Sequence, residues 1–204
     1  MASIEIRPDG PLAITGLERL VDDQGKDIVH SQEVVKLCRC GGSMNKPFCD
    51  GTHRRNGFSG ARVADGSEDK VLTYAGPGIT IHDNRSVCAH AGHCTDGLPE
   101  VFKYGSEPWI DPAGAIPQRI VETIRRCPSG ALSYGIDGAA PKAEEWKPSV
   151  TVTKDGPYAV LAVDLPGVPF AQGVPHARYT LCRCGASKNK PFCDGSHFET
   201  GFKG

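Results

Sequence analysis

Short β-prone runs bounded by Gly, Asp and Pro dominate the hydrophobic pattern of this chain. Two of them, at positions 13–15 and 34–37, lie near the N-terminal end, and two more, at 159–163 and 178–181, lie near the C-terminal end. Runs of this length between turn residues are typical of short strands. Both ends of the chain are therefore predicted to be rich in β-structure.

The middle of the chain carries one clear helical pattern. Proline opens the stretch 117–126, and Ile120, Val121 and Ile124 fall on one face of the helix it would form. Together with the short strands, this helix predicts a small α+β fold with many turns.

The composition indicates that such a fold needs stabilisation beyond its hydrophobic core. Gly 25 and Pro 16 make about a fifth of the 204 residues, and aromatic residues only 7%. Small, turn-rich units with thin cores usually need a metal or disulfide staple. The nine cysteines are an odd number, and the N-terminal residues form no apolar signal core, which argues against a disulfide framework. A cytoplasmic location is expected.

Charge and hydropathy exclude two classes of partner. Lys+Arg 23 against Asp+Glu 24 gives a net charge of −1, so the chain has no basic surplus to neutralise phosphates. No run approaches the roughly 18 apolar residues of a membrane span. We expect neither nucleic acid nor a membrane as a partner.

One block of sequence occurs twice. Residues 37–60 and 181–204 differ at seven of 24 positions, so 17 are identical. A weaker similarity upstream, between residues 4–11 and 150–157, extends each copy to about 55 to 60 residues. The predicted organisation is a first repeat domain at 1–60, a middle domain at 61–140, a linker at 141–147 and a second repeat domain at 148–204.

Each copy contains three cysteines and one histidine in the spacing C-x-C-x8-C-x3-H. This donor set suits an iron–sulfur cluster or zinc. Structural zinc usually takes cysteine pairs two to four residues apart. A Cys-x-Cys pair can instead share one iron, leaving the third cysteine and the histidine for a second iron. The candidate ligands are Cys38, Cys40, Cys49 and His53 in the first copy, and Cys182, Cys184, Cys193 and His197 in the second.

The motif that runs from Cys-Arg-Cys-Gly to Pro-Phe-Cys-Asp-Gly-[Thr/Ser]-His resembles the CDGSH iron–sulfur domain of the mitoNEET-type proteins. Thr52 stands where that family usually has Ser or Ala. The resemblance implies one [2Fe–2S] cluster in each copy, held by the eight ligands above. Because such domains form two-fold dimers, it also implies that the two copies pack as an intramolecular pseudo-dimer.

Two further residue types in the motif suggest supporting roles. The hydroxyls of Ser43 and Ser187 could donate hydrogen bonds to cluster sulfur, or the serines could be ordinary loop residues. Asp50 and Asp194 are placed to cap the short helical turn that carries the histidine.

The three remaining cysteines, Cys88, Cys94 and Cys127, lie in the middle domain. A bacterial ferredoxin run is C-x2-C-x2-C with a distant Cys-Pro. Here the first and third positions are cysteines, Ala91 occupies the second, and Cys127 precedes a proline.

This arrangement resembles the single-cluster ferredoxins over residues 79–138. The resemblance implies a ferredoxin-like α+β domain with one [3Fe–4S] or [4Fe–4S] cluster. The missing second cysteine leaves the number of irons open, and His90 is the candidate for a fourth-iron ligand.

These features favour an electron carrier with no catalytic residues of its own, acting as a monomer with an internal pseudo-dimer. Its partner would be a reductase, an oxidoreductase or an apo-protein that accepts clusters. The alternatives are a cluster store or redox and pH sensor, and a zinc-stapled interaction module.

Overall fold

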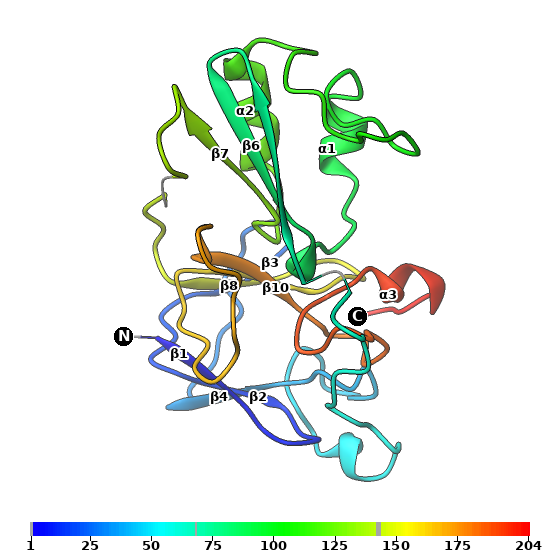
Figure 1. Cartoon of the computed structure of the whole chain (residues 1–204). Helices are drawn as coiled ribbons and strands as arrows, with labels where there is room; N and C mark the ends of the chain where they lie inside the picture. Colours follow the sequence, from blue (N-terminus) through cyan, green and yellow to red (C-terminus); the bar gives the residue numbers. More distant parts are fainter. Residues whose placement is uncertain (1, 68, 142–143) are drawn as a thin grey trace.

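The computed structural model describes residues 2–67, 69–141 and 144–204. It shows a small, mostly β protein with a few short helices and three sheets (Figure 1). The predicted α+β class is confirmed. Within the described ranges, no helix is long and apolar enough to cross a bilayer.

The first copy builds a three-stranded antiparallel sheet. Its strands β1 (Ser3–Ile6), β2 (Leu12–Thr15) and β4 (Val34–Leu37) pair in the order β1-β2-β4. Both β-prone runs predicted in this part of the chain are therefore strands.

The second copy repeats this arrangement with β8 (Ser149–Val152), β9 (Tyr158–Leu161) and β10 (Arg178–Leu181). The run predicted at 159–163 ends earlier, at Leu161, because Ala162 turns the backbone to a φ of 49°. Such a conformation cannot continue an extended strand.

A strand from the first copy joins the sheet of the second. β3 (Leu20–Asp22) pairs with β8 in parallel and completes the order β10-β9-β8-β3. In the opposite direction, the amide of Ile4 on β1 donates to the carbonyl oxygen of Asp164 at 2.8 Å. The hydrophobic pattern did not predict β3, because three residues show no period and the partner strand lies far along the sequence.

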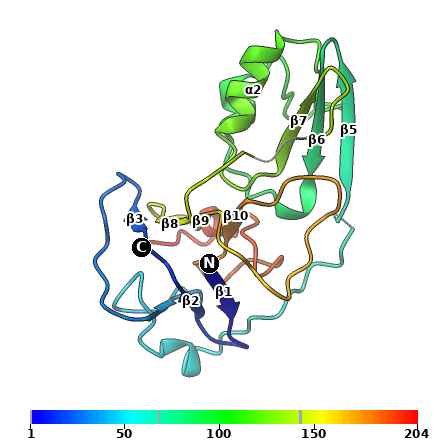
Figure 2. The ribbon, with the colours of Figure 1, turned by 90° about the vertical axis from the view of Figure 1, so that its left-hand side faces the viewer.

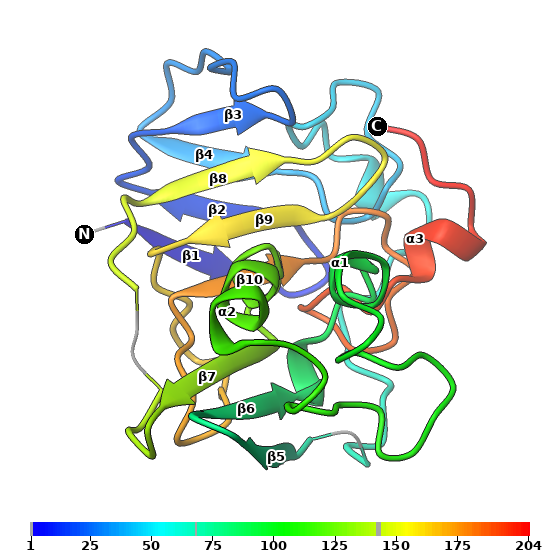
Figure 3. The ribbon, with the colours of Figure 1, turned by 90° about the horizontal axis from the view of Figure 1, so that it is seen from above.

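One apolar core serves both copies. The two sheets lie as stacked layers, with β8, β9 and β10 over β1, β2 and β4 (Figures 1 and 3). Completely buried Ile4 and Ile14 of the first copy belong to the same cluster as Val160 and Leu181 of the second. The two ends of the chain thus bury their apolar faces against each other.

The middle segment forms the third sheet and its own core. Strands β5 (Val71–Gly76), β6 (Ile79–Asn84) and β7 (Leu132–Ile136) pair antiparallel in the order β5-β6-β7. Helices α1 (His93–Gly97) and α2 (Pro117–Arg125) contact each other, and α2 also contacts β7. The helix predicted at 117–126 is confirmed to within one residue.

The middle segment sits on the second copy (Figure 2). The Arg178 guanidinium on β10 donates to the carbonyl oxygen of Arg125 at 2.6 Å. Cys88 and Cys127 pack against the shared core of the two copies, and Cys127 also packs against the core of the middle segment. Part of the predicted linker, residues 142–143, lies outside the described residues.

Candidate metal centres

In each copy, the cysteine loop folds back onto the last strand of its sheet. The amide of Cys38 donates to the carbonyl oxygen of Pro47 at 2.8 Å, and the amide of Cys49 donates to that of Lys36 at 2.8 Å. The same ladder recurs at Cys182 and Cys193. These backbone hydrogen bonds position the ligand loop against the strand.

The four predicted ligands of each copy come together as two pairs. In copy one, Cys38 Sγ lies 3.7 Å from Cys40 Sγ, and Cys49 Sγ lies 3.4 Å from His53 Nδ1. In copy two the corresponding distances are 3.8 and 3.4 Å. Two sulfur ligands on one tetrahedral metal, with bonds of about 2.3 Å, lie about 3.7 Å apart. Each pair is thus spaced to share one metal ion.

The close contacts between ligands occur only within these pairs. In each copy they join Cys to Cys and Cys to His. Across the described ranges, no group of three or more His, Cys, Asp or Glu side chains is placed to hold one ion.

Backbone amides support the ligand sulfurs. In copy one, the amide of Gly51 donates to Cys49 Sγ at 3.4 Å. In copy two, the amide of Gly195 donates to Cys193 Sγ at 3.5 Å, and that of Ala186 donates to Cys184 Sγ at 3.4 Å. Such hydrogen bonds stabilise negative charge on a thiolate and tune a bound cluster.

The serine hydroxyls point elsewhere. Ser43 Oγ donates to the carbonyl oxygen of Phe48 at 2.7 Å, and Ser187 Oγ donates to that of Phe192 at 2.7 Å. Each hydroxyl has one proton, and here the carbonyl oxygen takes it. Of the two roles considered for these serines, the structure supports the second, in which they are ordinary residues of the loop.

Asp50 and Asp194 stabilise the turn that carries the histidine, as predicted, although each lies one residue before the N-cap position. Asp50 Oδ1 accepts from the amide of Thr52 at 3.0 Å, while its Oδ2 accepts from that of Met44 at 2.9 Å. These hydrogen bonds hold the pKa of Asp50 well below its usual range. Asp194 makes the equivalent bonds in front of α3 (Ser196–Glu199).

The thiols of Cys182 and Cys184 have different pKa values. The hydrogen bond between the two sulfurs lowers the pKa of Cys184 to about 6 and raises that of Cys182. Metal ligation requires thiolates, and this hydrogen bond favours the thiolate form of Cys184.

The middle cysteines line one cavity. Cys88, Cys94 and Cys127 border a space of about 730 Å³, together with Ala91 and His90. Burial raises the pKa of Cys88 to about 11 and also raises that of Cys94. The structure thus brings together the three cysteines that the ferredoxin-like spacing predicted.

His90 lies on the wall of the same cavity. Its backbone amide hydrogen-bonds the Cys88 thiol, and its side chain is exposed. Its φ of 51° sets the loop turn after Cys88.

Comparison with known proteins agrees with these geometries. Residues 9–54 and 155–198 match the family described as iron-binding zinc finger, CDGSH type. Residues 74–137 match the family described as divergent 4Fe–4S mono-cluster. The chain belongs to the CDGSH family. It is an iron–sulfur protein whose two CDGSH regions flank a divergent mono-cluster domain.

Two curated relatives of this CDGSH protein carry the same name. Each is called uncharacterized protein YjdI, one from Escherichia coli strain K12 and one from Escherichia coli O157:H7. Each is 38% identical over 61 residues, which make up 30% of this chain and 80% of the relative.

The sequence patterns did not indicate the role of several residues that support the CDGSH sites. Arg39 and Arg183 are buried and tie the cysteine loops to the upstream turn; Arg39 Nε donates to the carbonyl oxygen of Gly10 at 2.7 Å. Their recurrence in both copies was the available signal. Tyr158 gave no such signal, because the position directly after the Asp-Gly-Pro turn is a leucine in copy one.

The two CDGSH sites differ in exposure. Cys193 and His197 of copy two are only 3% and 7% exposed, whereas Cys49 and His53 of copy one are half-buried. The copy-one pair borders an open cavity of about 810 Å³. Water therefore reaches the histidine of copy one more easily.

Proposed function

We propose that this protein is an iron–sulfur electron carrier. Each CDGSH copy would hold a [2Fe–2S] cluster through its three cysteines and one histidine. The middle domain would hold one [3Fe–4S] or [4Fe–4S] cluster through Cys88, Cys94 and Cys127. When bound, such clusters accept and release single electrons.

The observation that carries this proposal is the pairing of the CDGSH ligands. Intervals of 3.4 to 3.8 Å within each pair fit two tetrahedral metals per copy. The mono-cluster domain supports a redox role over simple storage, since a depot needs no third type of site. No residue of the chain is assigned a catalytic role, and the partner would be a reductase or an oxidoreductase in the cytoplasm.

The chain's own residues tune such a site. One imidazole in place of a thiolate makes the ligand set less negative, so the reduction potential should lie above that of an all-cysteine centre. The same imidazole can take up a proton, which makes binding sensitive to acid. The amides of Gly51 and Gly195 offset charge on the neighbouring sulfurs.

We also propose that the two copies form an intramolecular pseudo-dimer. The strand exchanged between copies and the shared core support this arrangement. The two cysteine loops also meet reciprocally. A Cβ at Gly41 would overlap the carbonyl oxygen of Cys184, and one at Gly185 would lie 2.8 Å from that of Cys40.

Metal and sulfide analysis of protein purified without air tests the carrier proposal. We expect about eight acid-labile sulfides per chain with seven or eight irons and no zinc. Seven irons would indicate a three-iron middle centre, and eight a ligated fourth iron, which His90→Ala should then remove. Cys88→Ser should abolish only the middle cluster. Two or three zinc ions without sulfide would instead indicate a zinc-stapled interaction module.

A cluster store or sensor is the second candidate. The half-buried Cys49 and His53, open to solvent, favour it. Incubation of loaded protein with an apo-ferredoxin separates the two functions. Ready transfer of the copy-one cluster would support the store, whereas retained clusters that cycle reversibly with a one-electron reductant would support the carrier.

A further inference from the structure

The loop that carries Cys88 packs directly on the ligand loop of copy two. A Cβ built on Gly195 would lie 3.3 Å from the Cβ of His90 and 3.5 Å from the carbonyl oxygen of Ala89. Gly195 lies two residues from both Cys193 and His197, and His90 lies two residues after Cys88. The backbone at Gly195 thus lies close beside the Ala89–His90 segment, with too little room between them for a larger side chain.

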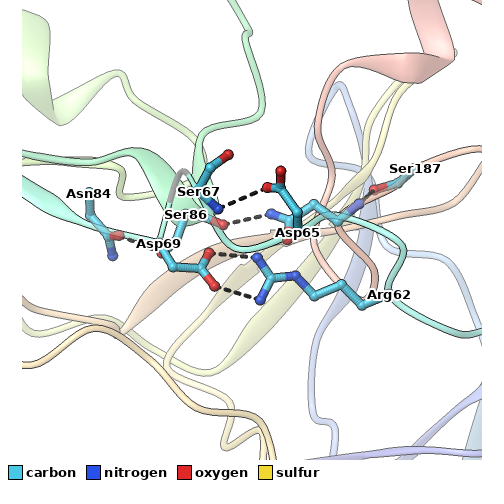
Figure 4. A network of polar contacts seen from close by, with 8 residues as sticks. Arg62, Asp65, Ser67, Asp69, Asn84, Ser86 and Ser187 are labelled. Carbon is cyan, nitrogen blue, oxygen red and sulfur yellow. Dashed lines mark hydrogen bonds and ion pairs between the residues drawn. The ribbon is translucent and has the colours of Figure 1, made fainter.

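A direct hydrogen bond fixes this contact. Asn189 Nδ2, in the copy-two loop, donates to the carbonyl oxygen of Ser86 at 2.7 Å. Figure 4 shows Ser86 between Asn84 and the copy-two loop near Ser187. Ser86 Oγ in turn donates to Asn84 Oδ1 at 2.5 Å, which anchors the turn to the end of β6.

The segment that enters the middle domain binds the same loop. The amides of Val63 and Ala64 both donate to the carbonyl oxygen of Lys188, at 2.8 and 2.9 Å. Arg62 and Asp69 then close this segment with two contacts of 2.6 Å (Figure 4). The approach of the middle domain to copy two is therefore held from two sides.

The equivalent positions in copy one carry no such partner in the described part of the chain. Gly51 has the same φ of 86° as Gly195, but a Cβ there would meet nothing within 4 Å. Copy one instead touches copy two, through Gly41 against Cys184 and Gly185 against Cys40. Copy two is thus in contact with both other sites.

We propose that the ligand loop of copy two is the middle member of a three-site relay, so that electrons would pass between the middle site and copy one through copy two. This inference rests on the proposed carrier function. The ligands of each site would hold its cluster, and the bound clusters would supply the one-electron chemistry: an electron given up by one cluster, which would be oxidised, would be taken up by the neighbouring cluster, which would be reduced. A one-electron donor protein would supply the electron at one end, and a one-electron acceptor protein would remove it at the other.

Electron paramagnetic resonance of the full-length protein, held in a redox titration at a potential where the middle site and copy two are both paramagnetic, tests the relay order. The signal of the middle site should be broadened or split by spin–spin interaction with copy two. Cys182→Ala, which removes the copy-two cluster, should abolish that broadening. Cys38→Ala, which removes the copy-one cluster, should leave it intact.

A matched pair of glycine variants tests the contact without removing a ligand. Asparagine tolerates a positive φ and adds bulk. Gly195→Asn should push the Ala89–His90 segment away and weaken the interaction, whereas Gly51→Asn places the same strain where nothing is touched. Asn189→Ala and Asn45→Ala form a second matched pair, of which only the first should weaken the broadening.

The outcomes separate this inference from the carrier function. A middle signal that is identical in wild type and Cys182→Ala, or that loses its broadening in Cys38→Ala, overturns the relay order and leaves the carrier standing. Equal effects of Gly195→Asn and Gly51→Asn would also overturn the contact. Protein without sulfide would overturn both.

Discussion

The hydroxyl group of Tyr158 in copy two donates to the backbone carbonyl oxygen of Cys38 in copy one, at 2.7 Å. The same hydroxyl lies 3.1 Å from the carbonyl oxygen of Pro47. Tyr158 is completely buried, and burial raises its pKa well above the usual range. A residue of one copy therefore fixes the backbone of a ligand in the other.

Tyr158→Phe should destabilise the copy-one site. The variant keeps the ring but leaves a buried carbonyl oxygen without this donor, which costs about 1–3 kcal/mol. We expect a lower free energy of unfolding and a shifted absorption spectrum of the copy-one cluster. Tyr179→Phe is the control, because its hydroxyl is also buried but donates to Val163 at 2.7 Å. Identical cluster spectra in both variants would show that Tyr158 contributes stability only.

Gly41→Ala tests the packing of the two copies. An added methyl group at Gly41 would overlap the carbonyl oxygen of Cys184, whereas at Gly57, with a similar φ of 69°, it would meet nothing within 4 Å. We expect Gly41→Ala to lower the free energy of unfolding by about 1–3 kcal/mol more than Gly57→Ala. Chemical denaturation of the loaded protein measures this difference. Equal losses would contradict close contact between the cysteine loops.

The sequence predicts the metal sites better than it predicts how they are assembled. The eight CDGSH ligands follow from a spacing within one loop, and the local ladder at Cys38 and Pro47 brings them together. The strand at 178–181 and the helix at 117–126 likewise depend on local patterns and agree with the structure.

Contacts between distant segments leave no such local trace. β3 contributes three residues to another copy's sheet, and Tyr158 differs from its leucine counterpart in copy one. The contact of Gly195 with His90 depends on two loops about a hundred residues apart. Only the fold brings these residues together, so the sequence patterns do not predict that the two CDGSH sites have different surroundings.

Asp83→Ala should destabilise the middle domain. The side chain of Asp83 is 1% exposed. Its carboxylate accepts hydrogen bonds from the Arg85 guanidinium at 2.8 Å and from Trp109 Nε1 at 3.2 Å, while Arg85 stacks over the Trp109 ring. Removing one partner of a largely buried ion pair costs about 2–4 kcal/mol. Because Arg85 also lies 3.8 Å from Cys88 Sγ, we expect loss of iron from the middle site first. Asp111→Ala, which removes a half-exposed pair with Lys103, is the control and should change little.

The two CDGSH clusters should be lost at different acidities. A histidine ligand must be neutral, and burial lowers the pKa of His197 below its usual 6.5, only partly opposed by Asp194. Because the pKa of His197 is lower in the folded protein than in the unfolded chain, the copy-two site keeps its full stability above pH 6.5. That stability falls as the pH drops below 6.5 toward the pKa of the folded protein. Water reaches His53 more easily, so copy one should lose its cluster at higher pH.

Absorbance titration of two variants, each with one CDGSH cluster left, measures this difference. Cys182→Ala reports on copy one and Cys38→Ala on copy two. His53→Cys should abolish the early loss and lower the potential of copy one, because a thiolate is more negative than an imidazole and needs no neutral ring. His197→Cys should lower the potential of copy two and leave the acid loss of copy one unchanged. Loss of the copy-two cluster at the higher pH would show that exposure does not control release.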